Sequence, residues 1–311
     1  KHIAIAAQKE ALEKTNQLES ISQQLSKYLS PQLYESIFSG EQKVDIVSKR
    51  KKLTLFFSDL VGFTSISDSL ESEEITAMLN FYLTEMSEIA LEFGGTIDKY
   101  VGDAIMAFWN APINQSDHTE RSVLAAIDMI EFTERISCLF RKRGNPEIRT
   151  RIGINTGKAI VGNVGTKNRF SYTVMGEVVN LASMLESVNK QYGTFLTISE
   201  STFDRVRDKV RARKLDIVRV KGNPKPVVIY ELIGRKGGFL DSKKEKALKA
   251  YSEGLEAYNY RHWETAIYHF TSAIKIDCDD VPSKIYLERC KTFRDKPPQK
   301  NWDGVFNFLS K

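Results

Sequence analysis

Two aspartates stand where they can act together on a charged substrate. Asp59 closes the strand-like run KLTLFFSD, and Asp103 follows a tight turn in KYVGDAIMAF. Two facing carboxylates repel unless a cation lies between them. The expected cation is Mg²⁺ or Mn²⁺, held by a few oxygens together with those of a triphosphate, and two such ions activate an attacking hydroxyl and stabilise a leaving pyrophosphate. The alternative is that each aspartate caps a turn.

The residues that follow Asp59 suit a phosphate group. The chain turns here from a strand towards a helix, and Gly62 lies in the turn. Backbone N–H groups around Gly62 and Phe63, together with the Thr64 hydroxyl, can cradle phosphate oxygens. A single glycine in a turn is weak evidence, but its place directly after a strand-end aspartate strengthens the prediction.

The periodicity of apolar residues predicts the elements that carry these side chains. A charged connector over 41–51 leads into a strand that starts at 52, a helix follows over 71–92, and Gly94-Gly95 ends that helix. There follow, in order, a hairpin, a helix over 117–143, a strand in IRTRIGIN, a loop in GKAIVGNVGTKNRFS, a helix over 177–190, a strand in TFLTIS, a short helix over 200–208, and strands near 213–220 and 226–233.

This order matches the ferredoxin-like βαββαβ arrangement. We therefore predict an α+β fold, with an antiparallel sheet covered by helices on one face. In such a sheet the first strand lies beside the hairpin, which brings Asp59 towards Asp103.

Helical segments flank this unit, so we expect three regions: 1–48, 49–235 and 236–311. The spacing of Leu18, Ile21, Leu25 and Tyr28 favours a helix that pairs in a dimeric coiled coil, although a lone surface helix is the alternative. After a linker over 236–245, the residues Gly254, Ala266, Phe270 and Ala273 are spaced as in one tetratricopeptide-type unit. A generic helical hairpin fits equally well. Either would lean on the preceding domain or on a partner copy.

Composition narrows the function classes. The 311 residues carry a net charge of +5, and 41% are hydrophobic, which suits an ordinary globular protein. No segment concentrates Lys and Arg with aromatics, so a nucleic-acid groove is disfavoured. Three scattered cysteines and the absence of an 18-residue apolar run favour a cytoplasmic chain. Because the first residue is Lys1, we expect a fragment whose upstream sensor or membrane segment lies outside it.

Four segments resemble the successive motifs of class III adenylate cyclases: FFSDLVGFT, GGTIDKYVGDAIMAFW, TRIGINTGKAIVGNVG and YTVMGEVVNLASMLE. They span about residues 52–233, and SKYLSPQL resembles the helical element that often precedes such domains. The resemblance implies a head-to-tail homodimer with parallel N-terminal helices, which converts ATP to cyclic AMP and pyrophosphate under the control of an upstream sensor. Two divalent metal ions would be bound by Asp59, Asp103 and the Leu60 carbonyl.

The resemblance also assigns roles to residues that contact the nucleotide. Lys99 and Thr173 would read adenine, Asn180 would orient the ribose, and Lys221 and Lys158 would contact the triphosphate. An ammonium donor suits the unprotonated ring nitrogen of adenine, whereas guanine offers an N–H there. Outside the motifs, each of these residues has a plainer interpretation, such as a solvated lysine or a locally bonded asparagine.

One position departs seriously from the family pattern. Met184 stands where the family has a catalytic arginine, and methionine has neither charge nor donor. By analogy with the loss of one oxyanion donor, the cost is on the order of 10²–10³ in rate. Ser183 cannot replace a guanidinium, and Arg169 could do so only if its loop reached inward. Ser171, where an aspartate often stands, is a milder departure. The alternative function is therefore a degenerate cyclase that binds nucleotide as a dimerisation and signalling module.

Overall fold

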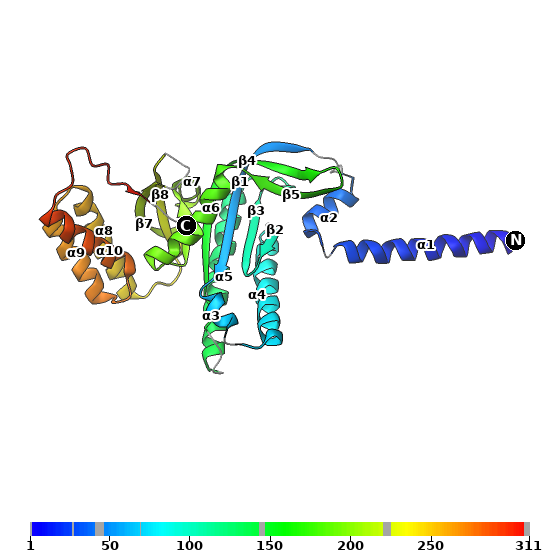
Figure 1. Ribbon diagram of the computed structural model, residues 1–311, viewed down its shortest axis with the longest axis horizontal. Helices are drawn as coiled ribbons and strands as arrows, with labels where there is room; N and C mark the ends of the chain where they lie inside the picture. Colours follow the sequence, from blue (N-terminus) through cyan, green and yellow to red (C-terminus); the bar gives the residue numbers. More distant parts are fainter. Residues whose placement is uncertain are drawn as a thin grey trace.

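The computed structural model describes residues 2–26, 28–40, 47–68, 70–142, 147–219 and 225–307. The described residues form ten helices and nine strands (Figure 1). The helices are α1 (His2–Ser26), α2 (Pro31–Phe38), α3 (Phe63–Ser67), α4 (Ser72–Glu92), α5 (His118–Lys142), α6 (Glu177–Tyr192), α7 (Glu200–Val206), α8 (Ser242–Asn259), α9 (Trp263–Ile276) and α10 (Val281–Asp295). The strands are β1 (Ser48–Leu60), β2 (Thr96–Val101), β3 (Ala104–Trp109), β4 (Thr150–Thr166), β5 (Arg169–Met175), β6 (Leu196–Ser199), β7 (Val210–Arg219), β8 (Val227–Arg235) and β9 (Phe306–Asn307).

The elements β1, α4, β2, β3, α5 and β4 form the predicted βαββαβ core. The strands follow one another across the sheet in the order β2-β3-β1-β4-β6-β8-β7-β9, with β5 paired to β4. β1 is antiparallel to β3, with Ser58 opposite Ile105, and antiparallel to β4, with Asp59 opposite Arg151. The predicted α+β fold is confirmed, with the first strand beside the hairpin.

Two features of the sheet differ from the prediction of a purely antiparallel sheet with helices on one face. β4 and β6 are parallel, as are β7 and β9. One face, which includes Phe56, packs against α4 and α5, whereas Leu55 on the other face packs with Ala182 of α6. Gly153 permits this second layer, because a Cβ there would lie 2.1 Å from the Glu186 backbone nitrogen. The βαββαβ unit accounts for α4 and α5 but does not include α6.

The segment predicted as a glycine-rich loop is a long β-hairpin. β4 continues through it and pairs with β5, placing Gly162 opposite Thr173. The other edge of β4 pairs with the start of β1, where Ser48 lies opposite Gly162, so the end of the predicted connector is also strand. Gly162 has φ +153°, and a Cβ there would meet the Val47 carbonyl oxygen at 2.2 Å. The glycines therefore permit close backbone approach inside a strand.

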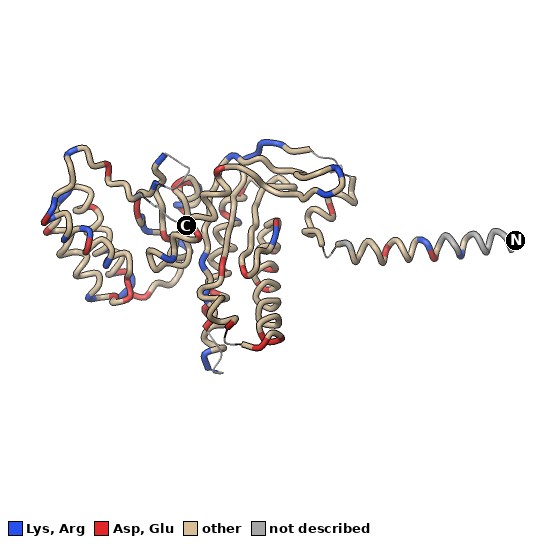
Figure 2. Tube along the Cα trace, in the orientation of Figure 1, with Lys and Arg blue, Asp and Glu red and all other residues tan. Residues whose placement is uncertain are grey.

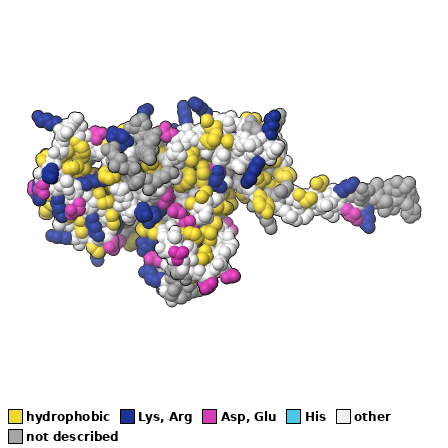
Figure 3. All heavy atoms as spheres, in the orientation of Figure 1, with side chains coloured by type: hydrophobic (Ala, Val, Ile, Leu, Met, Phe, Trp, Pro, Cys, Tyr) yellow, Lys and Arg dark blue, Asp and Glu magenta, His cyan; other side chains and the backbone are white. Residues whose placement is uncertain are grey.

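The N-terminal helix α1 stands away from the body of the molecule (Figures 1 and 3). Its apolar side chains Leu12, Leu18 and Ile21 are exposed, and the side chain of Leu25 lies outside the described residues. An exposed apolar stripe suits pairing of two helices, and the coiled coil stays a prediction.

The C-terminal helices α8, α9 and α10 pack together and dock onto the end of the sheet formed by β7 and β8. α8 starts at Ser242, inside the predicted linker. Gly254 lets α8 approach α9, because a Cβ there would lie 2.9 Å from the Phe270 ring. The chain then returns and β9 pairs with β7, with Phe306 opposite Val218. The module therefore leans on its own preceding domain.

Charged side chains of both signs are interspersed along the described chain (Figure 2). The start of β1 carries four consecutive basic residues, Lys49 to Lys52. Within the described ranges, none of the helices combines the length and the apolar character needed to cross a bilayer.

Candidate active site

The two aspartates meet at one end of the sheet. Asp59 lies near the end of β1, and Asp103 lies in the turn between β2 and β3, where Gly102 adopts φ +65°. The Leu60 N–H donates to Asp103 Oδ2 at 3.1 Å, and the carboxyls of Asp59 and Asp103 share a hydrogen bond. Pairing between β1 and β3 therefore brings together two carboxylates that lie 44 residues apart in the sequence.

The electrostatics of this pair are unusual. Burial raises the pKa of Asp59 to about 7. Hydrogen bonding with Asp103 and the negative charges of Asp103 and Glu186 also raise this pKa, whereas the positive charge of Arg151 lowers it. Burial also raises the pKa of Glu186, in α6. A pKa raised this far indicates that too little positive charge surrounds the carboxylate. A bound cation would supply that charge.

Arg151 is a residue that the motif comparison did not single out. It lies in β4 directly opposite Asp59, and its charge opposes the rise in the pKa of both Asp59 and Glu186. The available signal was its place in the otherwise apolar run RIGI, because a half-buried arginine in a strand needs an anionic partner. It therefore places a positive charge beside the carboxylate pair.

The carboxylate pair has the chemistry of a hard-cation site. Mg²⁺ takes oxygen ligands and is usually held by one or two carboxylates plus substrate phosphates. Among the described residues no group of three or more His, Cys, Asp and Glu side chains is placed to hold a metal ion. Asp59, Asp103 and the Leu60 carbonyl offer oxygen donors of the kind that such a cation prefers.

The turn after β1 forms the short helix α3. Gly62 precedes it with φ +70°, a conformation that disfavours residues with a Cβ. Phe63 packs against the core of the sheet, and Thr64 is exposed. The first amides of a helix have no acceptor inside it, so this turn presents N–H groups close to Asp59.

Lys99 and Thr173 come together from different strands. Lys99 Nζ, in β2, lies 3.4 Å from Thr173 Oγ1, in β5. Asp98, whose side chain is 0% exposed, joins them: its Oδ2 accepts the Thr173 hydroxyl at 2.6 Å, and its Oδ1 lies 3.1 Å from Lys99 Nζ. Sequence reasoning missed Asp98, because an acidic residue next to a lysine in a hairpin is ordinary on a surface.

Asn180 lies in the first turns of α6 and lines an open hollow, together with residues 174–177 and Val179. Two asparagine side chains hold α6 on β4. Asn155 Nδ2 donates to the Val178 carbonyl at 2.9 Å, and Asn189 Nδ2 donates to the Ile152 carbonyl at 2.9 Å. The hollow is wide open to solvent, so a ligand there would need a further surface to enclose it.

Two other predicted positions, Lys158 and Arg169, are not brought to the carboxylate pair, and a third, Lys221, lies outside the described residues. Lys158 is exposed on β4 opposite Lys52, seven residues from Arg151 and hence roughly 20 Å along the strand. Arg169 is exposed at the start of β5.

Met184 is half-buried and packs against an apolar cluster built on α6, β7 and β8. Its companions at the edge of this cluster include Ile285 from α10 and Phe306 from β9. The position where the resemblance expects a guanidinium thus packs on an apolar cluster against which two side chains of the C-terminal module also pack.

Comparison with known proteins identifies the family. A family model described as adenylate and guanylate cyclase catalytic domain matches residues 46–234. Adenylate cyclase 1 of Rhizobium meliloti (strain 1021) is 40% identical over 185 residues, which are 60% of this chain and 28% of that protein. A terminal-differentiation specific adenylate cyclase of Dictyostelium discoideum is 33% identical over 294 residues, which are 92% of this chain and 13% of that protein.

Solved structures agree with this match. The crystal structure of the adenylyl cyclase CyaB from P. aeruginosa is 39% identical, with a TM-score of 0.57, and covers 63% of this chain and 100% of that one. Proteins named guanylyl cyclases also match. The chain spans less than a third of either curated relative's length. From the family model and the shared fold, the chain belongs to the adenylate and guanylate cyclase catalytic domain family.

Proposed function

We propose that this chain is an adenylate cyclase that acts as a head-to-tail homodimer and converts ATP to 3′,5′-cyclic AMP and pyrophosphate with two divalent metal ions. The observation that carries the choice of ATP is the contact between Lys99 and Thr173, with Asp98 beneath both. Relatives named adenylate cyclases support it.

The hydrogen bonds of this trio suit adenine. Because the Thr173 hydroxyl donates to Asp98, its oxygen is left to accept, and adenine offers an amino group where guanine offers a carbonyl. The Lys99 ammonium donates only, which suits the unprotonated ring nitrogen of adenine and opposes the N–H of guanine. Asp98 thus orients both side chains for one base.

At the other end of the nucleotide, the chain would bind charge. Asp59, Asp103 and the Leu60 carbonyl would hold the metal ions, which when bound lower the pKa of the ribose 3′-hydroxyl and neutralise the leaving pyrophosphate. Arg151 and the amides after Gly62 would position the triphosphate, with Lys221 as a further candidate, and Asn180 would orient the ribose. Lys158 lies far from Asp59 in its own chain, so it would reach a triphosphate only in the site of a second copy. Positioning and electrostatics account for most of phosphoryl-transfer catalysis.

A second copy of the chain would complete each site. The hollow at Asn180 is open, and exposed apolar residues lie at the functional positions: Tyr100 and Val101 precede Asp103, and Met175 lines the hollow. Parallel pairing of two α1 helices fits this arrangement and would transmit a signal from an upstream sensor. A shift of the two halves by about an ångström can cost 10²-fold in rate.

A second candidate function rests on Met184. A cyclase domain without the arginine at this position would bind nucleotide and relay a signal as a dimeric module. Titration calorimetry with a non-hydrolysable ATP analogue, beside turnover of ATP by the native chain and by Met184→Arg, separates the two. Binding with turnover in the native chain supports the enzyme. Binding without turnover, with activity restored by Met184→Arg, supports the module, and absence of binding contradicts both.

A further inference from the structure

The helix that carries Asn180 and Met184 is gripped at its far end by the C-terminal module. Tyr192, the last residue of α6, is fully buried, and its hydroxyl donates to Asp216 Oδ2 in β7 at 2.5 Å. The same oxygen accepts from Arg289 Nη1 of α10 at 2.6 Å, and Arg289 Nη2 lies 3.4 Å from the Tyr192 hydroxyl. One arginine of the C-terminal module therefore contacts both the end of α6 and its anchor.

The geometry holds Arg289 in one place. Its guanidinium stacks 4.5 Å from the ring centroid of Phe306 and 5.0 Å from that of Tyr286. Asp216 is only 2% exposed, and it lies at an irregularity in the pairing of β7 with β8. A buried carboxylate whose cation is removed pays its desolvation cost without compensation, so Asp216 would release Tyr192 or draw in water if Arg289 were lost.

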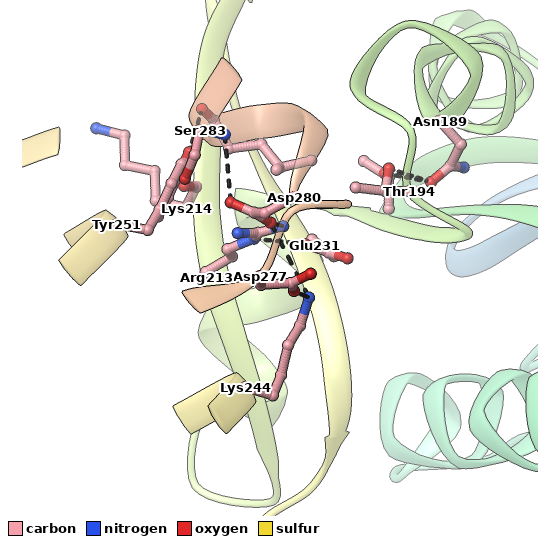
Figure 4. Close-up of polar contacts among 12 residues, drawn as sticks. Asn189, Thr194, Arg213, Lys214, Glu231, Lys244, Tyr251, Asp277, Asp280 and Ser283 are labelled. Atoms are coloured by element: carbon pink, nitrogen blue, oxygen red, sulfur yellow. Dashed lines mark hydrogen bonds and ion pairs between the residues drawn. The ribbon is translucent and has the colours of Figure 1, made fainter. Parts of the chain in front are cut away.

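A second ion cluster fixes the module to the sheet. Arg213 of β7 binds Glu231 of β8 and, at 2.7 Å, Asp280 at the start of α10, while the Tyr251 ring lies 4.6 Å from its guanidinium (Figure 4). Lys244 binds Asp277 at 3.0 Å in the same view. α10 is thereby fixed at its start by Arg213, and its Arg289 is fixed relative to β7.

Apolar contacts also hold α6 against the C-terminal module, on the side towards Met184. Ile285 of α10 and Phe306 of β9 adjoin the cluster that contains Leu185, Val188 and Tyr192, and Met184 lies at its edge. Val281 also closes over Gly193, where a Cβ would lie 2.6 Å from the Val281 side chain.

We propose that the C-terminal module is a positioning element for α6, with Arg289 as its main positioning residue, so that the module sets where Asn180 and residue 184 face the nucleotide. This inference rests on the proposed cyclase function. Arg289 touches no reacting atom and acts only through Tyr192 and Asp216.

A double-mutant cycle on the full chain tests it. Met184→Arg is expected to raise kcat by about 10², and this gain should fall below about 10-fold when Arg289→Met or Tyr192→Phe is also present, because a misplaced α6 misdirects the new guanidinium. Tyr192→Phe removes one hydroxyl without unpairing a charge, so it keeps the test valid if Arg289→Met fails to fold. Arg294→Met, an exposed arginine on the same helix, is the matched control and should leave the gain unchanged.

Hydrogen exchange of the same variants gives a readout that needs no turnover. Amides of α6 should exchange faster in Arg289→Met and Tyr192→Phe, while those of α4 stay as in the native chain. Unchanged exchange in α6, or faster exchange with an undiminished gain from Met184→Arg, would overturn the proposal. If no variant turned over nucleotide, the cyclase function itself would fail, and the exchange data alone would still decide whether the module holds α6.

Discussion

The half-buried Asp59 at the end of β1 and the buried Asp280 at the junction with the C-terminal module have pKa values that are shifted in opposite directions. At the end of β1, Asp59 and Asp103 face each other, and burial with mutual repulsion raises the pKa of Asp59 to about 7. At the junction with the C-terminal module, burial acts to raise the pKa of Asp280, but the charge and hydrogen bond of Arg213, with help from Ser283 and Lys244, lower it overall. The junction supplies its own cations, whereas the strand end leaves its charge to be matched by something bound.

This difference distinguishes a ligand-binding site, at the end of β1, from a structural junction, at the C-terminal module. A carboxylate that is fully paired within the chain has little left to offer a ligand, and its loss should appear as instability. A carboxylate that is left in excess is ready to bind a cation, and its loss should appear as lost activity.

The largest expected effect is on turnover. Asp59→Asn and Asp103→Asn should each lower kcat by at least about 10³-fold, because each removes a charged metal ligand. Neither should lower the urea midpoint of the metal-free protein, since each relieves repulsion. Asp68→Asn, at an exposed aspartate nearby, is the control. Retention of most of the activity by either variant would remove the metal assignment.

A substitution at the junction with the C-terminal module should lower stability rather than metal binding. Arg213→Met leaves Asp280 and Glu231 without their arginine and should lower the free energy of unfolding by about 3 kcal/mol. Urea denaturation measures this against Arg205→Met, an exposed arginine. Affinity for Mn²⁺, followed by calorimetry, should stay within a few-fold of native below the unfolding transition. A change of less than about 0.5 kcal/mol would mean that the ion cluster contributes nothing to the junction.

The next largest effect is on the preference for ATP over GTP, which should change by a smaller factor than kcat does in the variants of Asp59 and Asp103. Lys99→Glu replaces a donor by an acceptor and should shift the ratio of kcat/KM for ATP over GTP towards GTP by roughly 10–100-fold, which corresponds to about 1–3 kcal/mol. Asp98→Asn should shift it in the same direction by a smaller factor, because it loosens both base-reading side chains. An unchanged ratio in Lys99→Glu would show that Lys99 does not read the base.

The smallest effect is on the pH dependence of stability. The folded, metal-free protein holds the Asp59 proton with a pKa of about 7, above the ordinary value of 3.8. Its contribution to stability is therefore complete below the ordinary value and is lost as the pH rises through about 7. Between about pH 5 and about pH 8, the urea midpoint of the native chain should fall more than that of Asp59→Asn. Equal slopes would show that the pKa of Asp59 is not raised.

Local sequence signals predicted both the core of the fold and the meeting of the two aspartates. Strand alternation and helical spacing are local signals, and the βαββαβ order converts them into the meeting of β1 with the β2–β3 turn, and so of Asp59 with Asp103. What sequence reasoning missed depends on non-local geometry. The glycines of GKAIVGNVG read locally as a loop, although they lie in β4 and permit its close packing against the start of β1, β5 and α6. Asp98 and Arg151 gain meaning only from partners on other strands.

Cyclic nucleotide production by the native chain decides whether it is an adenylate cyclase, and it should be measured with ATP and with GTP, in Mn²⁺ and at high protein concentration. Cyclic AMP should be the main product, with a specific rate that rises with protein concentration because two copies share each site. Preference for GTP, or no cyclic nucleotide from either substrate in the native chain, would contradict the proposed adenylate cyclase function.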